Sequence, residues 1–257
     1  MAPSPRLLID QPLSPGLEIA LDDAQARHVG TVLRLDVNDV LRVFNAADGE
    51  WRAVIAAKSK RGMSVRVVEQ LRAARAVPDL DLLFAPVKRH ATDLIVEKAT
   101  ELGVRRIRPV ITQRTIAETV RLDRLHTIAR EAAEQTERFD APEIAEPASL
   151  PRILDGWDRA RPLLYADEQG DDASATWGGE TGRAQPIGEA LGVWASAPRL
   201  ALLVGPEGGF TIEERRMLRA LAFVTPVSLG PRILRAETAA IAALSIIQSA
   251  WGDWGGV

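Results

Sequence analysis

The chain has 257 residues, which is enough for one large domain or two smaller ones with a sizeable core. Hydrophobic residues make up 46% and charged residues 26%, the balance of a globular protein. No apolar run approaches the about 20 residues that span a bilayer, and the first residues lack the apolar stretch of a signal peptide, so we expect a cytoplasmic protein. Cysteine is absent, which excludes disulfides, thiolate metal sites and a cysteine nucleophile.

The net charge of −3 is distributed unevenly. Residues 1–75 hold 11 Lys and Arg against 9 Asp and Glu, so the N-terminal part is the more basic one. This mild bias permits RNA binding without demonstrating it. The three histidines, His28, His90 and His126, lie far apart and lack the spacing of metal ligands, so we expect no metal site.

The first 75 residues are predicted to be mostly β-structure. A short helical segment, 23–33, precedes three β-rich runs, and Asp48-Gly49 between the first two is a strong hairpin signal. The predicted strands are 39–45, 51–57 and 63–70. This pattern indicates a small β-barrel in residues 1–75, followed by a linker before Pro78.

After Pro78, strands and helices alternate, which predicts an α/β domain over residues 76–257 with a parallel sheet covered on both faces. The predicted strands are 80–85, 107–111, 163–166, 200–204 and 224–229. The predicted helices are 92–102, 122–139, 211–222 and 236–251. Thr211 and Glu214 have the spacing of a capping box. Residues 167–187 are rich in small and polar residues and indicate a solvated loop.

Two glycine-rich loops follow predicted strands, where ligands of open α/β sheets bind. The first is Gly-Pro-Glu-Gly-Gly-Phe at 205–210, and the second is Gly-Pro-Arg-Ile-Leu-Arg-Ala-Glu-Thr-Ala at 230–239. Neither matches a nucleotide-triphosphate or dinucleotide fingerprint. One such loop alone is more often a strand–helix turn that needs glycine, but two at equivalent strand ends indicate one binding pocket.

A third polar segment, Glu-Gln-Thr-Glu-Arg at 134–138, ends the predicted helix before Pro142. Glu134 and Arg138 are four residues apart and therefore share a helix face. Taken alone, this segment is typical of a solvated helix end with one ion pair.

Together these segments resemble the ribosomal RNA small subunit methyltransferase E family. The likeness covers nearly the whole chain and is most specific in the paired C-terminal motifs, LLVGPEGGFTIEE at 202–214 and SLGPRILRAETAAIAAL at 228–244. Residues 27–39, 96–104 and 132–144 are also similar to stretches of the family. The stretch 87–93 departs from the family pattern, and the loop 167–187 is longer than expected.

The resemblance implies an N-terminal PUA-like β-barrel and a C-terminal SPOUT α/β domain with a trefoil knot. It implies a homodimer that uses S-adenosylmethionine (SAM) to methylate N3 of a uridine in 16S ribosomal RNA, either free or in the assembled small subunit. The family's cofactor sits among the knot loops. Carried over, the cofactor-binding positions are Leu203, Gly205, Glu207, Gly209, Leu229, Gly230, Ile233, Leu234, Glu237 and Thr238.

Methylation at N3 requires loss of the N3 proton, so a base or a cation that stabilises the uridine anion should help. The candidate cations are Arg232, Arg235 and Arg138, and the candidate bases are Glu134 and Glu101, between which the sequence does not choose. RNA-binding candidates are Arg27, Arg34, Lys58, Lys60, Arg61, Arg66, Lys88 and Arg89, although a solvated basic rim is the better explanation for any one of them taken alone.

Two alternatives remain at this stage. One is a ribose 2′-O-methyltransferase of the same superfamily, and the other is a non-catalytic RNA-binding factor in ribosome assembly. The polar residues kept in both loops disfavour a pocket without a catalytic role.

Overall fold

The computed structural model describes residues 4–59, 62–116, 119–167 and 184–256. The chain forms two compact units. Unit 1 comprises Met1–Ala76 and Ala133–Ala141, and unit 2 comprises Val77–Ala132 and Pro142–Val257. The division near residue 76 lies beside the one expected from sequence, whereas Ala133–Ala141 joins the first unit, which the sequence did not indicate.

Unit 1 contains a five-stranded sheet in the order β1-β3-β4-β5-β2. The strands are β1 (Arg6–Leu8), β2 (Glu18–Ala20), β3 (Val40–Asn45), β4 (Gly49–Ser59) and β5 (Gly62–Arg72). β1 pairs with β3 in parallel, and the other neighbours are antiparallel. Val43 of β3, Ile55 of β4 and Val65 of β5 are fully buried and form part of one core. Within β5, every second residue from Met63 to Val67 is buried, as the alternation of apolar and polar residues in the sequence predicts.

The predicted helix 23–33 is an α-helix only in its first half. α1 (Asp23–Arg27) begins with a capping box between Asp22 and Gln25, and a π-helical turn, His28–Val32, follows it. Glycine and β-branched residues occupy positions 30–32 and have low helix propensity, which is consistent with the change.

The helix α3 (Leu122–Gln135) starts in unit 2 and ends in unit 1. The predicted helix to residue 139 was too long, because Glu137 has a left-handed backbone (φ 66°) that ends regular helix. The Arg6 guanidinium donates hydrogen bonds to the carbonyl oxygens of Ala133 (3.1 Å), Glu134 (3.2 Å) and Arg138 (2.9 Å). A cation therefore binds the carbonyls at this helix end.

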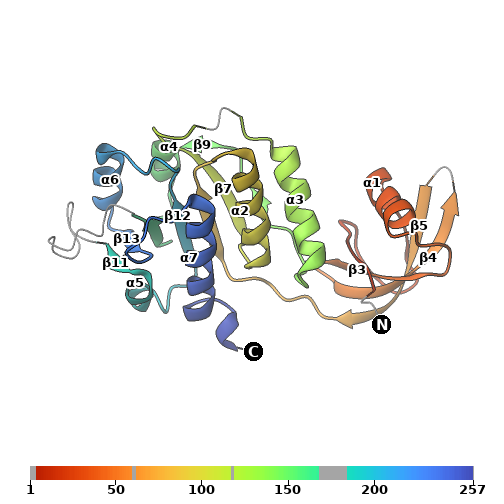
Figure 1. Ribbon diagram of the computed structural model, residues 1–257. Helices are drawn as coiled ribbons and strands as arrows, with labels where there is room; N and C mark the ends of the chain where they lie inside the picture. The colour runs from red at the N-terminus through yellow and green to blue at the C-terminus, as the bar shows by residue number, and fades with distance from the viewer. Residues whose placement is uncertain (1–3, 60–61, 117–118, 168–183, 257) are drawn as a thin grey trace. The chain divides into compact units, whose positions relative to one another are not determined.

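Unit 2 contains a parallel sheet in the order β11-β13-β10-β12-β6-β7-β8, with β9 also on β7 (Figure 1). Its strands are β6 (Leu80–Phe84), β7 (Arg106–Ile111), β8 (Glu143–Ile144), β9 (Ala148–Ser149), β10 (Leu163–Ala166), β11 (Gln185–Pro186), β12 (Leu200–Val204) and β13 (Val224–Ser228). The parallel pairing confirms the predicted α/β class.

Helices cover both faces of this sheet, as the sequence predicts. The remaining helices of unit 2 are α2 (Arg89–Glu101), α4 (Leu150–Asp155), α5 (Ile187–Val193), α6 (Ile212–Arg219) and α7 (Ala236–Ala250). Leu82 and Leu202 pack into one core with α2, α3, α5 and α7, whereas Leu83 and Leu203 pack into another with α4 and α6. The capping box of Thr211 and Glu214 at the start of α6 is confirmed.

The predicted solvated loop 167–187 is wrong at both ends. Asp167 is buried, β11 occupies Gln185–Pro186, and α5 begins at Ile187. The rest of that loop, 168–183, lies outside the described residues. Within the part of the chain that the structure describes, no helix is both long and apolar enough to cross a membrane.

Candidate functional site

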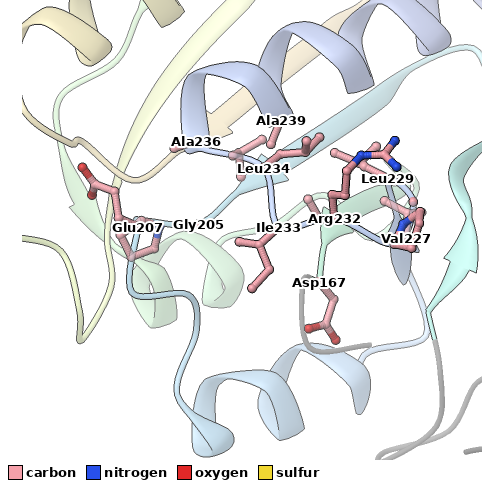
Figure 2. A pocket seen from close by; sticks show the side chains of 15 residues that line it. Asp167, Gly205, Glu207, Val227, Leu229, Arg232, Ile233, Leu234, Ala236 and Ala239 are labelled. Atoms are coloured by element: carbon pink, nitrogen blue, oxygen red, sulfur yellow. The ribbon is translucent and has the colours of Figure 1, made fainter. Parts of the chain in front are cut away.

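A pocket of unit 2 opens at the carboxyl ends of three neighbouring strands, β10, β12 and β13 (Figure 2). It encloses about 710 Å³ between atoms, part of it open to solvent. The lining residues are Ala166, Asp167, Val204, Gly205, Pro206, Glu207, Val227, Leu229, Gly230, Pro231, Arg232, Ile233, Leu234, Ala236 and Ala239. The two glycine-rich loops therefore form one pocket, as their positions after predicted strands suggested.

Two lining positions require glycine for different reasons. A Cβ at Gly205 would lie 2.9 Å from the ring of Phe210, so the chain and that ring approach more closely than a side chain permits. Gly230 has φ of +101°, a backbone conformation that other residues rarely adopt. Glycine is thus required by contact with the Phe210 ring at Gly205 and by backbone conformation at Gly230.

Much of the remaining lining is apolar. Leu229, Ile233 and Leu234 come from the second loop, and Ala236 and Ala239 from the start of α7. Ile233 is 85% exposed, so a large apolar side chain lies beside the pocket without protein cover. In Figure 2, Ile233 lies between Glu207 at one end and Arg232 at the other. An apolar surface between polar ends suits a flat ring that carries polar groups.

Asp167 is a lining residue that sequence reasoning missed. Its side chain is fully buried, accepts a hydrogen bond from the Tyr165 hydroxyl at 2.8 Å, and pairs with Arg215 (3.0 Å) and Arg219 (2.8 Å) of α6. Burial alone raises the pKa of Asp167, but hydrogen bonds from Arg215, Arg219 and Tyr165 outweigh it, so the pKa is lowered and the carboxylate stays ionised. The sequence did indicate a position near a binding site, because Asp167 directly follows the buried strand β10, and ligands bind at the carboxyl ends of such strands.

Some predicted cofactor-binding residues do not line the pocket. Leu203 points into the core beside α6, and Gly209 has φ of +65° within the first loop. Glu237 and Thr238 belong to the first turn of α7. The predicted residues that do line the pocket are Gly205, Glu207, Leu229, Gly230, Ile233 and Leu234.

The four predicted catalytic residues fall in two places. Arg232 lines the pocket, and Arg235 is the N-cap residue of α7 three positions later. Arg138 and Glu134 belong to unit 1 instead. There Arg138 is buried and pairs with Asp140 (2.8 Å), and the Glu134 carboxylate accepts a hydrogen bond from the Leu8 amide (3.0 Å). Glu101, the other candidate base, pairs with Lys98 (2.7 Å).

Two family models match the chain. A model described as an RNA methyltransferase domain matches residues 75–248, and one described as an RNA methyltransferase PUA domain matches residues 21–68. The ribosomal RNA small subunit methyltransferase E of Rickettsia conorii is 35% identical, over 95% of this chain and 94% of that protein. The chain belongs to the ribosomal RNA small subunit methyltransferase E family. It is therefore an RNA methyltransferase with a PUA domain.

Solved structures of similar proteins agree with this. Ribosomal RNA small subunit methyltransferase E from Neisseria gonorrhoeae, bound to S-adenosyl methionine, is 27% identical with a TM-score of 0.83, over 98% of this chain and 99% of that one. A putative methyltransferase from Legionella pneumophila, in complex with the cofactor SAM, is 31% identical with a TM-score of 0.80, over 97% and 99% of the two chains.

The methyltransferase's candidate RNA-binding residues lie in both units. Arg27, Arg34, Lys58 and Arg66 are exposed in unit 1, and Lys88 and Arg89 are exposed at the start of α2 in unit 2. Lys60 and Arg61 lie outside the described residues. Among the residues whose placement is described, no three His, Asp or Glu side chains gather as a metal site would require.

Proposed function

We propose that this methyltransferase transfers the methyl group of SAM to N3 of a uridine in the 16S ribosomal RNA of the small subunit. The observation that carries the proposal is the pocket shared by the two glycine-rich loops, in a chain whose relatives have been solved with this cofactor bound. The uridine position follows from the family resemblance.

The lining residues fit SAM. Leu229, Ile233 and Leu234 provide apolar contacts for the adenine ring, and the backbone at Gly205 and Gly230 is open to hydrogen-bond the polar parts of the cofactor. SAM, when bound, supplies a methyl group on a positively charged sulfur. The exposed carboxylate of Glu207 offsets only a small part of that charge, because solvent screens it, and Leu203, Gly209, Glu237 and Thr238 support the loops around the cofactor.

Arg232 is our first candidate for stabilising the uridine anion, because it lines the pocket and carries a guanidinium group. Arg235, at the start of α7, is the second. Arg138 and Glu134 remain candidates through the resemblance alone, and their contacts within unit 1 favour a structural role.

The proposal includes four further features, of which the knot and the homodimer follow from the resemblance. The barrel of unit 1 binds rRNA through Arg27, Arg34, Lys58, Lys60, Arg61 and Arg66; the loops around the pocket form a trefoil knot; the enzyme acts in the cytoplasm; and it is a homodimer. Light scattering of the purified protein tests the dimer, and a monomeric mass contradicts it.

The decisive experiment uses purified protein, labelled SAM and small ribosomal subunits that lack the modification. After incubation, the rRNA is digested to nucleosides and analysed by mass spectrometry. Label in N3-methyluridine is the expected result. Label in a 2′-O-methyl nucleoside would keep the cofactor and overturn the target atom. SAM binding without label would point to another RNA, and failure to bind SAM would overturn the proposed function.

A further inference from the structure

A second hollow of unit 2 opens beside the first. It begins at the carboxyl end of β6 and runs along the first turns of α2 and α3, with about 1700 Å³ between atoms when the space open to solvent is included. β6 pairs with β12 in parallel, with Phe84 opposite Val204, and the Ala85 amide donates to the Val204 carbonyl oxygen at 2.9 Å. The two hollows therefore start from adjacent strand ends, and Glu207 lines both.

We call this second hollow the α2 groove. Its walls come from residues 86–89, Thr92 and Asp93 on one side and from Val120, Arg121, residues 123–125, Thr127, Ile128 and Glu131 on the other. Thr92 fixes the entrance to α2, because its hydroxyl accepts a hydrogen bond from the Val87 amide and donates one to the Val87 carbonyl oxygen, both at 3.1 Å. The residues that begin α2 are thus held in place before any ligand arrives.

Of the four cations that line the α2 groove, two form ion pairs within the described part of the chain and two do not. Arg124 forms a two-pronged pair with Asp93 (2.6 and 2.9 Å), and Arg121 pairs with Asp123 (2.7 Å), so these cations are already balanced. Lys88 and Arg89 are exposed, and among the described residues neither forms an ion pair. Two adjacent unpaired cations at one end of a groove suit a phosphate backbone.

Glu207 places a negatively charged side chain where the two hollows meet. It is exposed at the boundary of both hollows, and within the described part of the chain its carboxylate accepts no hydrogen bond. In Figure 2 its side chain lies at one end of the pocket, with the carboxylate directed away from Ile233 and Leu234. A carboxylate can only accept hydrogen bonds at neutral pH, so it suits a ligand that presents an N–H group.

We propose that the α2 groove holds the target nucleotide: Lys88 and Arg89 bind its flanking phosphates, and Glu207 accepts the hydrogen bond from uracil N3–H. This inference rests on the proposed function. The base must leave its stack to reach the groove, as other base-modifying enzymes require. When N3 is methylated, the N–H bond breaks and the proton forms an O–H bond on the Glu207 carboxylate. The electron pair left on N3 forms the new N–C bond, while the methyl–sulfur bond of SAM breaks and its pair stays on sulfur.

The first test compares Lys88→Ala/Arg89→Ala with a matched control, Arg152→Ala/Arg159→Ala, which removes two exposed cations of unit 2 outside the groove. The measurements are SAM affinity, affinity for unmodified small subunits, and the KM and kcat of methylation. We expect the groove variant to bind subunits about tenfold more weakly, with KM raised and with kcat and SAM affinity unchanged. The control should match the wild type.

Unchanged subunit affinity in the groove variant would overturn the phosphate assignment. Equal losses in both double variants would also overturn it, because the effect would then be one of net charge. The binding measurement does not depend on the product. If the wild type makes no N3-methyluridine but the groove variant alone loses RNA affinity, the proposed function fails while the groove remains an RNA site.

The second test is Glu207→Gln, with Glu213→Gln as control because Glu213 is exposed on α6 and lines neither hollow. If Glu207 takes the proton, its amide variant should lose about 100-fold in kcat, and the acidic limb of the kcat–pH profile should disappear because an amide does not titrate there. SAM affinity should change less than about threefold. A tenfold loss of SAM affinity with an unchanged pH profile would assign Glu207 to the cofactor and overturn this role.

Discussion

Two residues that line the pocket, Gly205 and Asp167, are required for different physical reasons. At Gly205 the constraint is space, because the Phe210 ring occupies the position that a side chain would take. At Asp167 it is charge, because a fully buried carboxylate neutralises guanidinium groups that hold α6 to the end of β10. The pocket shape therefore depends on residues that need not touch the cofactor.

Gly205→Ala tests the steric requirement. A methyl group 2.9 Å from the Phe210 ring forces the ring or the loop to move, and overpacking of this kind costs about 1–3 kcal/mol of stability. We expect weaker SAM binding as well, measured by titration calorimetry. Gly188→Ala is the control, since Gly188 is exposed on α5 and its new methyl would meet nothing within 4 Å. Equal SAM affinity for both variants and the wild type would contradict the prediction.

Asp167→Asn tests the buried charge. The substitution leaves two guanidinium groups without their carboxylate, so we expect a loss of about 3–5 kcal/mol in the free energy of unfolding at pH 7. Because the native pKa of Asp167 is lowered, the stabilisation by its carboxylate is complete above the unfolded pKa, about 3.9, and is lost as pH falls through the native value. The difference from wild type should therefore shrink below about pH 4 in urea unfolding.

The pKa of Asp81, which also lies in unit 2, is shifted in the opposite direction to that of Asp167. Burial raises its pKa, which Arg161, Arg106 and Arg108 at 3.5–3.9 Å only partly counteract, and among the described residues its oxygens accept no hydrogen bond. A raised native pKa means that wild-type stability falls as pH rises above about 4. Asp81→Asn should then improve relative to wild type over that range, and a trend parallel to that of Asp167→Asn would contradict one of the two pKa directions.

At the scale of elements, the sequence predicted the longer strands and helices, but it did not predict where some of them end. The parallel sheet and its long helices were predictable because strands such as β10 and β12 are continuous apolar runs and each long helix has one apolar face, whereas the two-residue strands β8, β9 and β11 and the short helices α4 and α5 were not predicted. The pocket loops were predictable from glycines after strands. The end of α3 was not, because Arg6 binds its carbonyl oxygens from 127 or more residues away in sequence. Asp167 was missed because its partners lie on α6, about 50 residues later.

Arg6→Ala tests how the end of α3 is held. The substitution removes three hydrogen bonds to carbonyl oxygens and one of the partners of the buried Glu50 (2.6 Å), so we expect a loss of about 3–5 kcal/mol. Amides of residues 133–141 should exchange faster in hydrogen-exchange mass spectrometry. Arg52→Ala, which removes an exposed pair with Glu69 (3.0 Å), should cost no more than about 1 kcal/mol. Unaltered exchange at 133–141 would show that Arg6 does not hold this segment.

For the whole molecule, the net charge of −3 is unfavourable for binding RNA, so local cations must supply the attraction. Each phosphate contact contributes about 0.7–0.9 to the slope of log affinity against log salt concentration. If the exposed residues Arg27, Arg34 and Arg66 of unit 1 bind rRNA, the triple variant with alanine at these positions should lower that slope by about 2–3.

The control removes the same charge elsewhere. Arg152, Arg159 and Arg216 are exposed in unit 2, and alanine at these three positions changes the net charge by the same amount. Affinity for unmodified small subunits would be measured over a range of about 50–200 mM salt for the wild type and both variants, so that each slope can be determined. If general attraction between protein and RNA governed binding, both variants would shift affinity equally. A lower slope confined to the unit 1 variant would instead locate phosphate contacts there, because only localised contacts release counterions on binding.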